Sequence, residues 1–238
     1  MNINIITLFP NMFSGIFEES IIKRAAAKSL VTIRIVPLRD FGLGAHKVVD
    51  DTPYGGGGGM ILKPEPIAEA LENLVSTGKV ILTTPRGRLF SQDDALHLSA
   101  EETLTIICGH YEGVDERVTE LFVDEEISIG DYVLTGGELP AMVLVDSIVR
   151  LIPGVLGQDT LHTGDSHYDG LLEHPQYTRP REFRDLEVPD VLLSGNHDEI
   201  MKWRKMMAER KTHEVRPDLL EKSRSLSNSS SGKTKIQP

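Results

Sequence analysis

Glycine-rich segments hold the residues of this sequence that are best suited to bind a ligand. Residues 53–60 read PYGGGGGM, and five consecutive glycines permit positive φ angles and close approach of the backbone to a ligand. No Gly-Lys-Ser/Thr follows them and no G-x-G-x-x-G spacing occurs, which excludes a P-loop and a dinucleotide-binding turn. The segment is either a flexible surface turn or an anchored functional loop, and Asp50 and Asp51 before it favour the second.

Three further polar segments follow predicted strands. Residues 83–87 read TTPRG, residues 108–113 read CGHYEG and residues 128–140 read SIGDYVLTGGELP. In open α/β sheets, ligands bind beyond the carboxyl ends of the strands. Each segment alone is most simply an ordinary turn. The three together predict a site whose backbone amides and carbonyls meet a flat, polar ring such as adenine.

Nucleophilic and metal chemistry have little support in the sequence. Cys108 and His110 would suit a nucleophile–base dyad, but Gly109 between them favours a turn, and we expect Cys108 to be a buried strand-end residue. It is the single cysteine, and the eight histidines are scattered without ligand spacing. We therefore predict no metal site built by the protein alone.

Acid–base chemistry has candidates between residues 150 and 175. Asp165, Asp169 and Glu173 lie in a polar stretch that follows a predicted helix ending near Arg150. Asp is a common turn former and Arg150 would also suit a surface, so none of these residues marks a site by itself. Residues 200–207 (IMKWRKMM) suit either a solvated helix or contact with an RNA backbone.

The charge is unevenly distributed along the 238 residues. The formal net charge is −11, with 25 Lys and Arg against 36 Asp and Glu, which at first argues against a nucleic-acid partner. Residues 1–175 carry a net −14 and residues 176–238 a net +3. This asymmetry fits either a solvated helical surface or a basic accessory region on an acidic body.

Composition excludes several classes of protein. The hydrophobic share of 39% is too high for a disordered chain, and one cysteine excludes a disulfide scaffold. The first residues lead into an apolar run without a charged segment before it, so we expect no secretory signal. Apolar runs stop well short of the ~18 residues that span a bilayer. We expect a soluble, cytoplasmic protein that has no membrane partner.

Short aliphatic runs alternate with helical patterns over the first 150 residues. Buried strands separated by helices predict an α/β fold with a parallel sheet covered on both faces. We expect strands at residues 2–9, 31–36, 79–84, 103–108 and 126–129, and helices at 14–28, 64–76, 91–98 and 138–151. Ser14 and Ser91 are the expected N-caps of two of these helices.

The composition changes after Ile152, and we expect three parts. Residues 1–157 form the α/β domain, residues 158–180 a flexible interdomain linker and residues 181–238 a small helical domain. Within the last part we expect a basic helix at 196–211 capped by Asn196, a short helix at 218–224 and a frayed Ser-rich tail from 225.

Six segments, taken in order, identify a resemblance. They are PYGGGGGM, CGHYEGVDER, SIGDYVLTGGELPAM, RLIPGVLG, DSHYDGLLEHPQYTRP and VPDVLLSGNH. The chain, from its first strand to about Leu220, resembles the bacterial tRNA (guanine-N1)-methyltransferases of the SPOUT superfamily. This resemblance implies a deep trefoil knot in the α/β domain, which periodicity alone does not predict because knots are nearly absent from protein folds.

The resemblance also implies a reaction and a set of site residues. S-adenosylmethionine would donate a methyl group to N1 of guanosine 37 of tRNA, beside the anticodon, and another guanosine would precede the target. Asp165 matches the catalytic aspartate of the family and Arg150 its partner arginine. The cofactor would be held by Thr84, Pro85, Gly109, Tyr111, Ile129, Gly130, Asp131, Tyr132, Val133, Leu134, Gly136, Gly137 and Pro140. Substrate contacts would come from Asp50, Gly55, Gly59, Glu112 and Ser166.

The resemblance further implies an obligate homodimer that binds tRNA rather than DNA. Its active site would form between one subunit's knot and the other's C-terminal domain, and the linker would order over the bound guanine. Three positions depart from the common pattern: Gly58 replaces Pro, His110 replaces Arg and Gln176 replaces His. The sequence leaves open whether Mg²⁺ assists the reaction.

Two other functions fit parts of the sequence. One is a knotted binding protein without catalysis, against which Asp165 and Arg150 argue. The other is a carboxylate hydrolase using Asp165 and Glu173, which leaves the glycine loops unexplained. Methyl incorporation that depends on guanosine 37 would separate the three.

Overall fold

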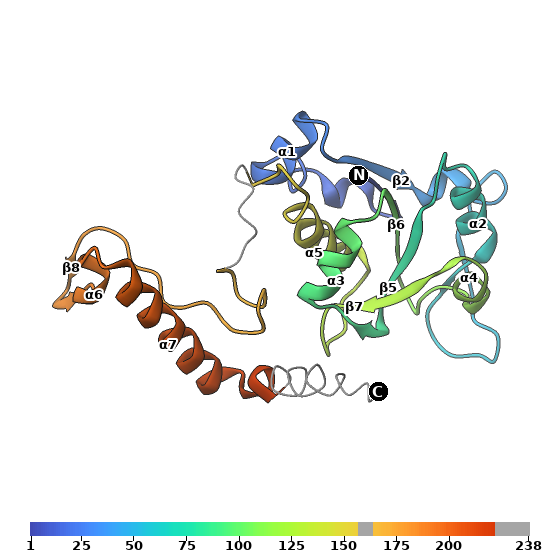
Figure 1. The fold of residues 1–238 in the computed structure, drawn as a ribbon. Helices are drawn as coiled ribbons and strands as arrows, with labels where there is room; N and C mark the ends of the chain where they lie inside the picture. Colours follow the sequence, from blue (N-terminus) through green and yellow to red (C-terminus); the bar gives the residue numbers. More distant parts are fainter. Residues whose placement is uncertain (157–163, 222–238) are drawn as a thin grey trace, which may run out of the picture. The chain divides into compact units, whose positions relative to one another are not determined.

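The computed structural model describes residues 1–156 and 164–221. The chain divides into two compact units, Met1–Asp159 and Thr160–Pro238, and each is described by itself (Figure 1). The boundary falls close to the composition change after Ile152.

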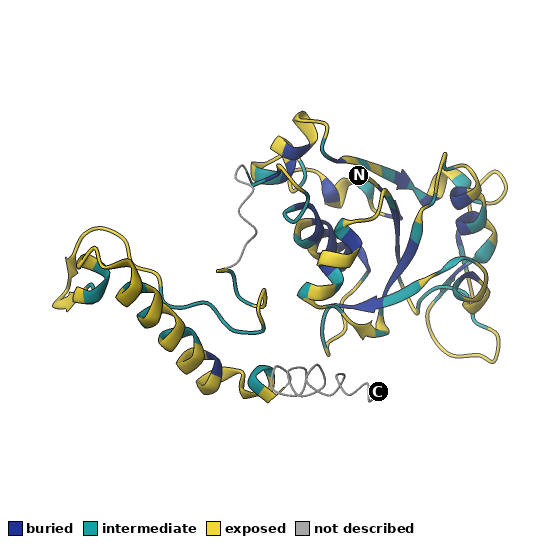
Figure 2. Cartoon of the chain, in the orientation of Figure 1, coloured by how far each residue is buried: buried dark blue, intermediate teal, exposed yellow. Residues whose placement is uncertain are grey.

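A five-stranded sheet forms the centre of the first unit. Its order is β2-β1-β6-β5-β7, and all neighbouring pairs are parallel, which confirms the predicted α/β class. The strands are β1 (Asn2–Thr7), β2 (Thr32–Pro37), β5 (Lys79–Leu89), β6 (Thr103–Cys108) and β7 (Glu125–Ser128). Aliphatic residues make β1, β6 and the first half of β5 almost continuously buried, as expected of a parallel sheet covered on both faces (Figure 2). The edge strand β2 is more exposed.

Helices cover both faces of the sheet. The helices α1 (Ser20–Ala27), α3 (Gln92–Ser99) and α5 (Glu138–Val149) pack in one apolar layer. The opposite layer contains α2 (Pro64–Glu72) and α4 (Glu116–Phe122) (Figure 1). Successive strand residues point to opposite layers. Ile81 belongs to the first layer and Leu82 to the second.

The first predicted helix starts later than its pattern indicated. Ser14 does not cap α1, because it ends a 3₁₀ helix, η1 (Pro10–Phe13), and a turn through Gly15 at φ +93° follows. The helix α1 begins at Ser20. The predicted cap at Ser91 is confirmed: Ser91 and Asp94 form a reciprocal capping box at the start of α3.

Two predictions over the rest of the first unit were incomplete. The seven-residue helix α4 was not expected, because its sequence ERVTELF is short and charged. Residues 38–60, where neither a helix nor a strand was expected, contain a 3₁₀ helix, η2 (Leu38–Phe41), and β3 (Asp50–Asp51). The strand β3 pairs with β4 (Ile61–Leu62), so the two ends of the glycine-rich segment are held together.

The second unit is mainly helical but also contains a hairpin. It consists of β8 (Glu182–Phe183), β9 (Leu186–Glu187), α6 (Asp190–Leu193) and α7 (His197–Val215). The predicted cap of α7 is confirmed, because the Asn196 side chain accepts a hydrogen bond from the Glu199 amide. The small hairpin was not expected in a region predicted to be helical.

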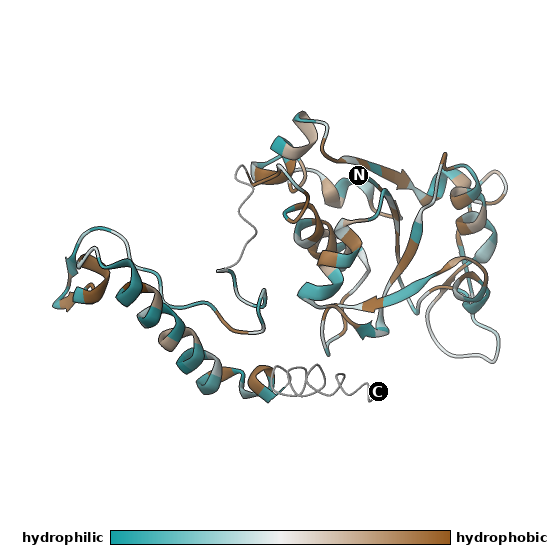
Figure 3. Cartoon of the chain, viewed as in Figure 1, coloured by the Kyte–Doolittle hydropathy of each residue, from teal (hydrophilic) through white to brown (hydrophobic). Residues whose placement is uncertain are grey.

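Residues before the hairpin pack on α7. The Leu172 amide donates to the buried hydroxyl of Thr212 at 2.9 Å, and the His174 and Tyr177 rings lie 6.4 and 6.3 Å from the Trp203 ring. Most of α7 is hydrophilic (Figure 3). Residues 217–221 are helical, whereas the rest of the expected 218–224 helix and the Ser-rich tail lie outside the described residues. None of the helices in the described ranges has the length and hydropathy needed to cross a bilayer.

Candidate functional site

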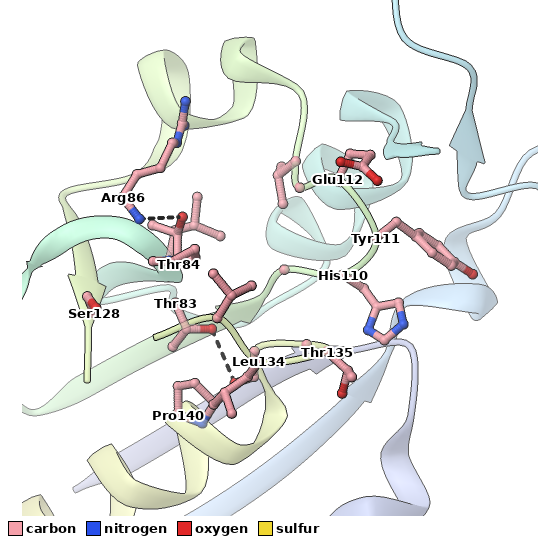
Figure 4. A pocket seen from close by; sticks show the side chains of 18 of the residues that line it. Thr83, Thr84, Arg86, His110, Tyr111, Glu112, Ser128, Leu134, Thr135 and Pro140 are labelled. Atoms are coloured by element: carbon pink, nitrogen blue, oxygen red, sulfur yellow. Dashed lines mark hydrogen bonds between the residues drawn. The ribbon is translucent and has the colours of Figure 1, made fainter. Parts of the chain in front are cut away.

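A cavity of about 560 Å³ lies at the carboxyl ends of β6 and β7, beside residues 82–86 of β5. Its walls are these residues of β5, the segments that follow β6 and β7, and the start of α5 (Figure 4). Parallel strands bring their carboxyl ends to one edge of the sheet, which is why segments far apart in sequence meet here. The volume suits a small organic ligand.

Gly137 brings two of these segments into direct contact. Its amide donates to the Gly109 carbonyl at 2.7 Å, and its carbonyl accepts from the Thr83 hydroxyl at 3.2 Å. A Cβ at residue 137 would lie 2.7 Å from the Gly109 nitrogen and 2.8 Å from the Cys108 Cα atom. Only glycine permits this approach, so the cavity wall here is main chain.

The glycine-rich segment is anchored to the loop that follows β6. The Glu112 amide donates to the Met60 carbonyl and the Leu62 amide to the Gly113 carbonyl, each at 3.0 Å. Gly59 has φ +85°, and a Cβ there would lie 2.5 Å from Cγ of Glu112. The segment is therefore held at its end, as the anchored-loop interpretation expected, while Gly55 has open space around its Cα.

A buried carboxylate lies behind the cavity. Glu138 is 1% exposed, and its Oε1 accepts a hydrogen bond from the Thr7 hydroxyl at 2.7 Å. His110 Nδ1 lies 4.0 Å from its Oε2 and, within the described residues, has no hydrogen-bond partner. The His110 ring also contacts the rings of Phe9 and Tyr111, with centroids 4.7 and 4.6 Å away.

Charged side chains flank another wall of the cavity. Arg86 forms ion pairs with Glu116 at 2.9 Å and Glu126 at 3.3 Å. The hydrogen bond to Glu116 and its charge raise the pKa of Arg86 above its already high usual value. Arg86 thus stays cationic and connects β5 with the first turn of α4. Its amide also donates to the Thr84 hydroxyl (Figure 4).

Most residues predicted to bind a cofactor line this cavity. All of them do so except Asp131, and Glu112 lines it too. Asp50, Gly55 and Gly59 are not among the lining residues. Sequence reasoning assigned no ligand contact to several other lining residues. Ten of them lie within the quoted segments: Tyr54, Thr83, Arg86, His110, Gly113, Val114, Asp115, Glu116, Ser128 and Thr135. Three more directly adjoin these segments: Ile61, Leu82 and Ile127.

The two predicted catalytic residues lie in different units. Arg150 caps the C-terminus of α5 in the first unit. Asp165 and Ser166 belong to the second, where the Ser166 hydroxyl accepts from the Glu173 amide at 2.9 Å and the Asp165 carbonyl accepts from the Tyr168 amide at 3.3 Å. Residues 158–163 of the predicted linker lie outside the described residues.

Cys108 is buried, as predicted for a strand-end residue. Burial raises the pKa of its thiol well above the usual value, and the charge of Glu138 raises it further. A thiol held in its neutral form is a poor nucleophile. Across residues 1–156 and 164–221, no group of three or more His, Cys, Asp and Glu residues is placed to hold a metal ion.

The cavity fits the implied cofactor, S-adenosylmethionine. Gly136 and Gly137 present bare main chain to the cavity, because a Cβ at either residue would overlap protein atoms behind the wall. Exposed Tyr132, Val133 and Leu134 add apolar surface on which a purine ring can pack. Main-chain groups of the same loops supply donors and acceptors for the polar edge of such a ring.

Comparison with known proteins decides the family. Residues 1–222 match the family described as tRNA (Guanine-1)-methyltransferase TrmD. The chain belongs to this family. Three relatives named tRNA (guanine-N(1)-)-methyltransferase come from Geotalea uraniireducens (59% identical), Dehalococcoides mccartyi (57%) and Desulforamulus reducens (54%). The alignments cover 92%, 93% and 92% of this chain and 90%, 91% and 89% of those relatives.

The family match spans both units. It includes the glycine-lined cavity of the first unit and Asp165 in the second. The chain therefore belongs to the TrmD family over both of its compact parts, and not through one shared domain.

Proposed function

We propose that this chain is an enzyme that transfers a methyl group from S-adenosylmethionine to N1 of guanosine 37 in tRNA. The observation that carries the proposal is the glycine-walled cavity at the carboxyl edge of the sheet, in a chain that belongs to the TrmD family. The names of its relatives support guanine N1 as the target. Position 37 comes from the resemblance noted in the sequence.

The residues of the cavity would hold the cofactor mainly through the backbone. Gly109, Gly136 and Gly137 leave room for the ligand against main-chain amides and carbonyls, and Tyr132 and Leu134 offer apolar contact. When bound there, S-adenosylmethionine supplies an electrophilic methyl group activated by a positive sulfonium. A nucleophilic cysteine is not needed, which agrees with the neutral thiol of Cys108.

Asp165 and Arg150 would act on the guanine. Guanine N1 carries a proton at neutral pH, and the Asp165 carboxylate would accept it as N1 forms its bond to carbon and the sulfur keeps the electron pair of the broken bond. General-base assistance of this kind contributes about 10²–10⁴-fold. The Arg150 guanidinium would stabilise the negative charge that develops on O6.

Glu112, Asp50 and Ser166 would position the target base and the guanosine before it. Glu112 lines the cavity, and Gly59 packs against its side chain. The second unit, with a net charge of +3 over residues 176–238, would contact tRNA phosphates. Because tRNA is the substrate, we place the enzyme in the cytoplasm. We leave Mg²⁺ as an additive to be tested in the assay.

We also propose a homodimer and a trefoil knot. Exposed apolar side chains on α5 support the dimer. Leu139 and Val143 lie four residues apart and therefore on one face of this helix. The helix also contacts η1, where Met12 is exposed, so these side chains offer apolar surface that a second subunit could cover. Hydrogen bonds that join the loops after β6 and β7, such as Gly137 to Gly109, agree with a knotted arrangement of these segments.

A methyl-transfer assay tests the proposal. The full chain is incubated with S-adenosylmethionine labelled in the methyl group and with two tRNA transcripts that differ only in G37 or A37. We expect incorporation into the G37 transcript alone, and nuclease digestion should yield 1-methylguanosine. A folded chain that binds both ligands but incorporates no label would favour a binding protein without catalysis.

The Asp165→Asn variant tests the role of the base. Asn has nearly the same shape but cannot accept the N1 proton, so we expect kcat to fall by at least about 10²-fold while the Kd for tRNA changes little. Asp169→Asn is the matched control, because Asp169 lies on the same segment and should retain activity. A normal kcat in Asp165→Asn would contradict the assignment.

A further inference from the structure

Glu138 is a buried carboxylate that no step of the proposed reaction uses. It is the first residue of α5 and directly follows Gly136 and Gly137, which line the cavity. Its side chain is 2% exposed and accepts one hydrogen bond from the Thr7 hydroxyl. Burial of a carboxylate costs stability unless it is well compensated, so its place beside the cavity calls for an explanation.

The carboxylate lies directly behind the cavity wall. Gly136 lines the cavity, and a Cβ on Gly136 would overlap Oε2 of Glu138 and lie 2.5 Å from Nδ1 of His110. The Cα–Cβ direction at residue 136 thus points at Glu138. Because residue 136 has no side chain, its main chain is the layer between the carboxylate and the cavity.

Glu138 lies in the first turn of the 12-residue helix α5, where the helix dipole stabilises a negative charge. Within the described ranges, the basic side chain recorded as its ion-pair partner is His110, at 4.0 Å. At this distance the two groups form no hydrogen bond, and His110 Nδ1 has no hydrogen-bond partner in the part of the chain that the structure describes.

We propose that Glu138 is a specificity-determining residue that favours the positively charged methyl donor over the uncharged product. The inference rests on the proposed function. S-adenosylmethionine carries a sulfonium cation, whereas S-adenosylhomocysteine has a neutral thioether and otherwise the same groups. The Glu138 carboxylate lies behind the main chain of Gly136, where little water screens its charge. It therefore attracts a sulfonium cation in the cavity without touching it. After transfer this attraction is lost, which favours release of the product.

Calorimetric titration of the full chain with three ligands tests this selectivity. The ligands are S-adenosylmethionine, S-adenosylhomocysteine and sinefungin, which carries an amine cation near the position of the sulfonium. In Glu138→Gln we expect the Kd of both cationic ligands to rise about tenfold and that of S-adenosylhomocysteine to change less than twofold. An equal loss for all three ligands would overturn the proposal and assign Glu138 a structural role.

Two further variants keep the test valid if Glu138→Gln does not fold. Thr7→Val removes the hydroxyl contact but keeps the carboxylate, so the ratio of the Kd values for donor and product should stay that of the wild type. His110→Arg places a permanent cation beside Glu138 and should lower the preference for both cationic ligands. An unchanged preference in His110→Arg would contradict the proposal.

The outcomes also separate this inference from the proposed function. If the wild-type chain binds none of the three ligands, the cofactor assignment itself fails. If it binds all three and the variants keep the wild-type selectivity, only the role of Glu138 is wrong.

Discussion

The glycines in the PYGGGGGM segment differ in backbone conformation and in the space around them. Four of the five have positive φ angles, and Gly58 is the exception. A Cβ at Gly58 meets nothing within 4 Å, whereas a Cβ at Gly59 would meet the Glu112 side chain. A side chain therefore fits at residue 58 but not at residue 59, which packs against a residue that lines the cavity.

Gly59→Ala should impair substrate binding. The φ of +85° costs alanine about 1 kcal/mol, and the added methyl group displaces the Glu112 side chain. Since Glu112 is proposed to contact guanine, we expect the KM for tRNA to rise about tenfold, which corresponds to ~1.4 kcal/mol. Steady-state kinetics of Gly58→Ala, the matched control, should agree with the wild type within about twofold. Equal effects in both variants would contradict a specific role for Gly59.

At the scale of elements, the sheet is the best-predicted part of the fold. Residues 79–84 and 103–108 are aliphatic runs long enough for buried strands, and both are strands in the structure. The helix α4 was not predicted, because its apolar face is only a few residues long. Contact between residues such as His110 and Glu138, far apart in sequence, depends on tertiary packing and has no local signal.

The capping box at α3 offers a test of local stability. In Ser91→Ala the Asp94 amide loses its side-chain acceptor and the Asp94 carboxylate loses the Ser91 hydroxyl, whereas the bond from the amide of residue 91 to Asp94 remains. We expect the free energy of unfolding to fall by about 1 kcal/mol, measured by denaturant titration. Ser99→Ala, at the other end of the same helix, should have a smaller effect. A larger loss in Ser99→Ala would show that the cap is not the dominant contact.

The ion pairs that Glu125 of β7 forms with Lys79 and Arg88 of β5 should make the stability of the fold depend on pH. Burial acts to raise the pKa of Glu125, but contacts from Lys79 and Arg88 outweigh it and the net pKa lies below the usual 4.5. The contribution of Glu125 to stability is therefore complete above the unfolded-state pKa and is lost as the pH falls through the folded-state value.

Glu125→Gln measures that contribution. At pH 7 we expect the variant to be about 1 kcal/mol less stable than the wild type, because Lys79 and Arg88 each lose an ion pair, although Arg88 keeps its ion pair with Asp94. The difference should shrink as the pH falls below about 4, where the wild-type carboxyl group also becomes neutral. Chemical denaturation across pH 3–7 checks this, and a difference that does not change with pH would contradict the ion-pair explanation.

On the scale of the whole molecule, the units Met1–Asp159 and Thr160–Pro238 divide the proposed machinery between them. The cavity and Arg150 belong to the first unit, and Asp165 belongs to the second. Physical reasoning on the sequence located the glycine segments, but the roles of Asp165 and Arg150 came from the family resemblance. Turn-forming carboxylates and surface arginines are too common for their types alone to indicate catalysis.

The proposed homodimer can be tested on the exposed face of α5. In Leu139→Lys combined with Val143→Lys, two charges would have to be buried in the subunit interface, so we expect the dimer Kd to rise at least about 10²-fold. Sedimentation velocity measures this change. Leu121→Lys on α4, which packs in the opposite layer, is the control and should leave the sedimentation coefficient unchanged. A stable dimer in the double variant would place the interface elsewhere.

The contact of Gly137 with Gly109 and Thr83 bears on how this cavity can change under selection. An inhibitor that binds main-chain groups at Gly109, Gly136 and Gly137 would meet few side chains whose exchange could weaken it. Replacing Gly136 or Gly137 would create overlaps within the protein before it disturbed the inhibitor. Resistance by point mutation at this wall should therefore be rare, and resistant variants should arise instead at side chains around the cavity rim, such as Tyr132 and Val133.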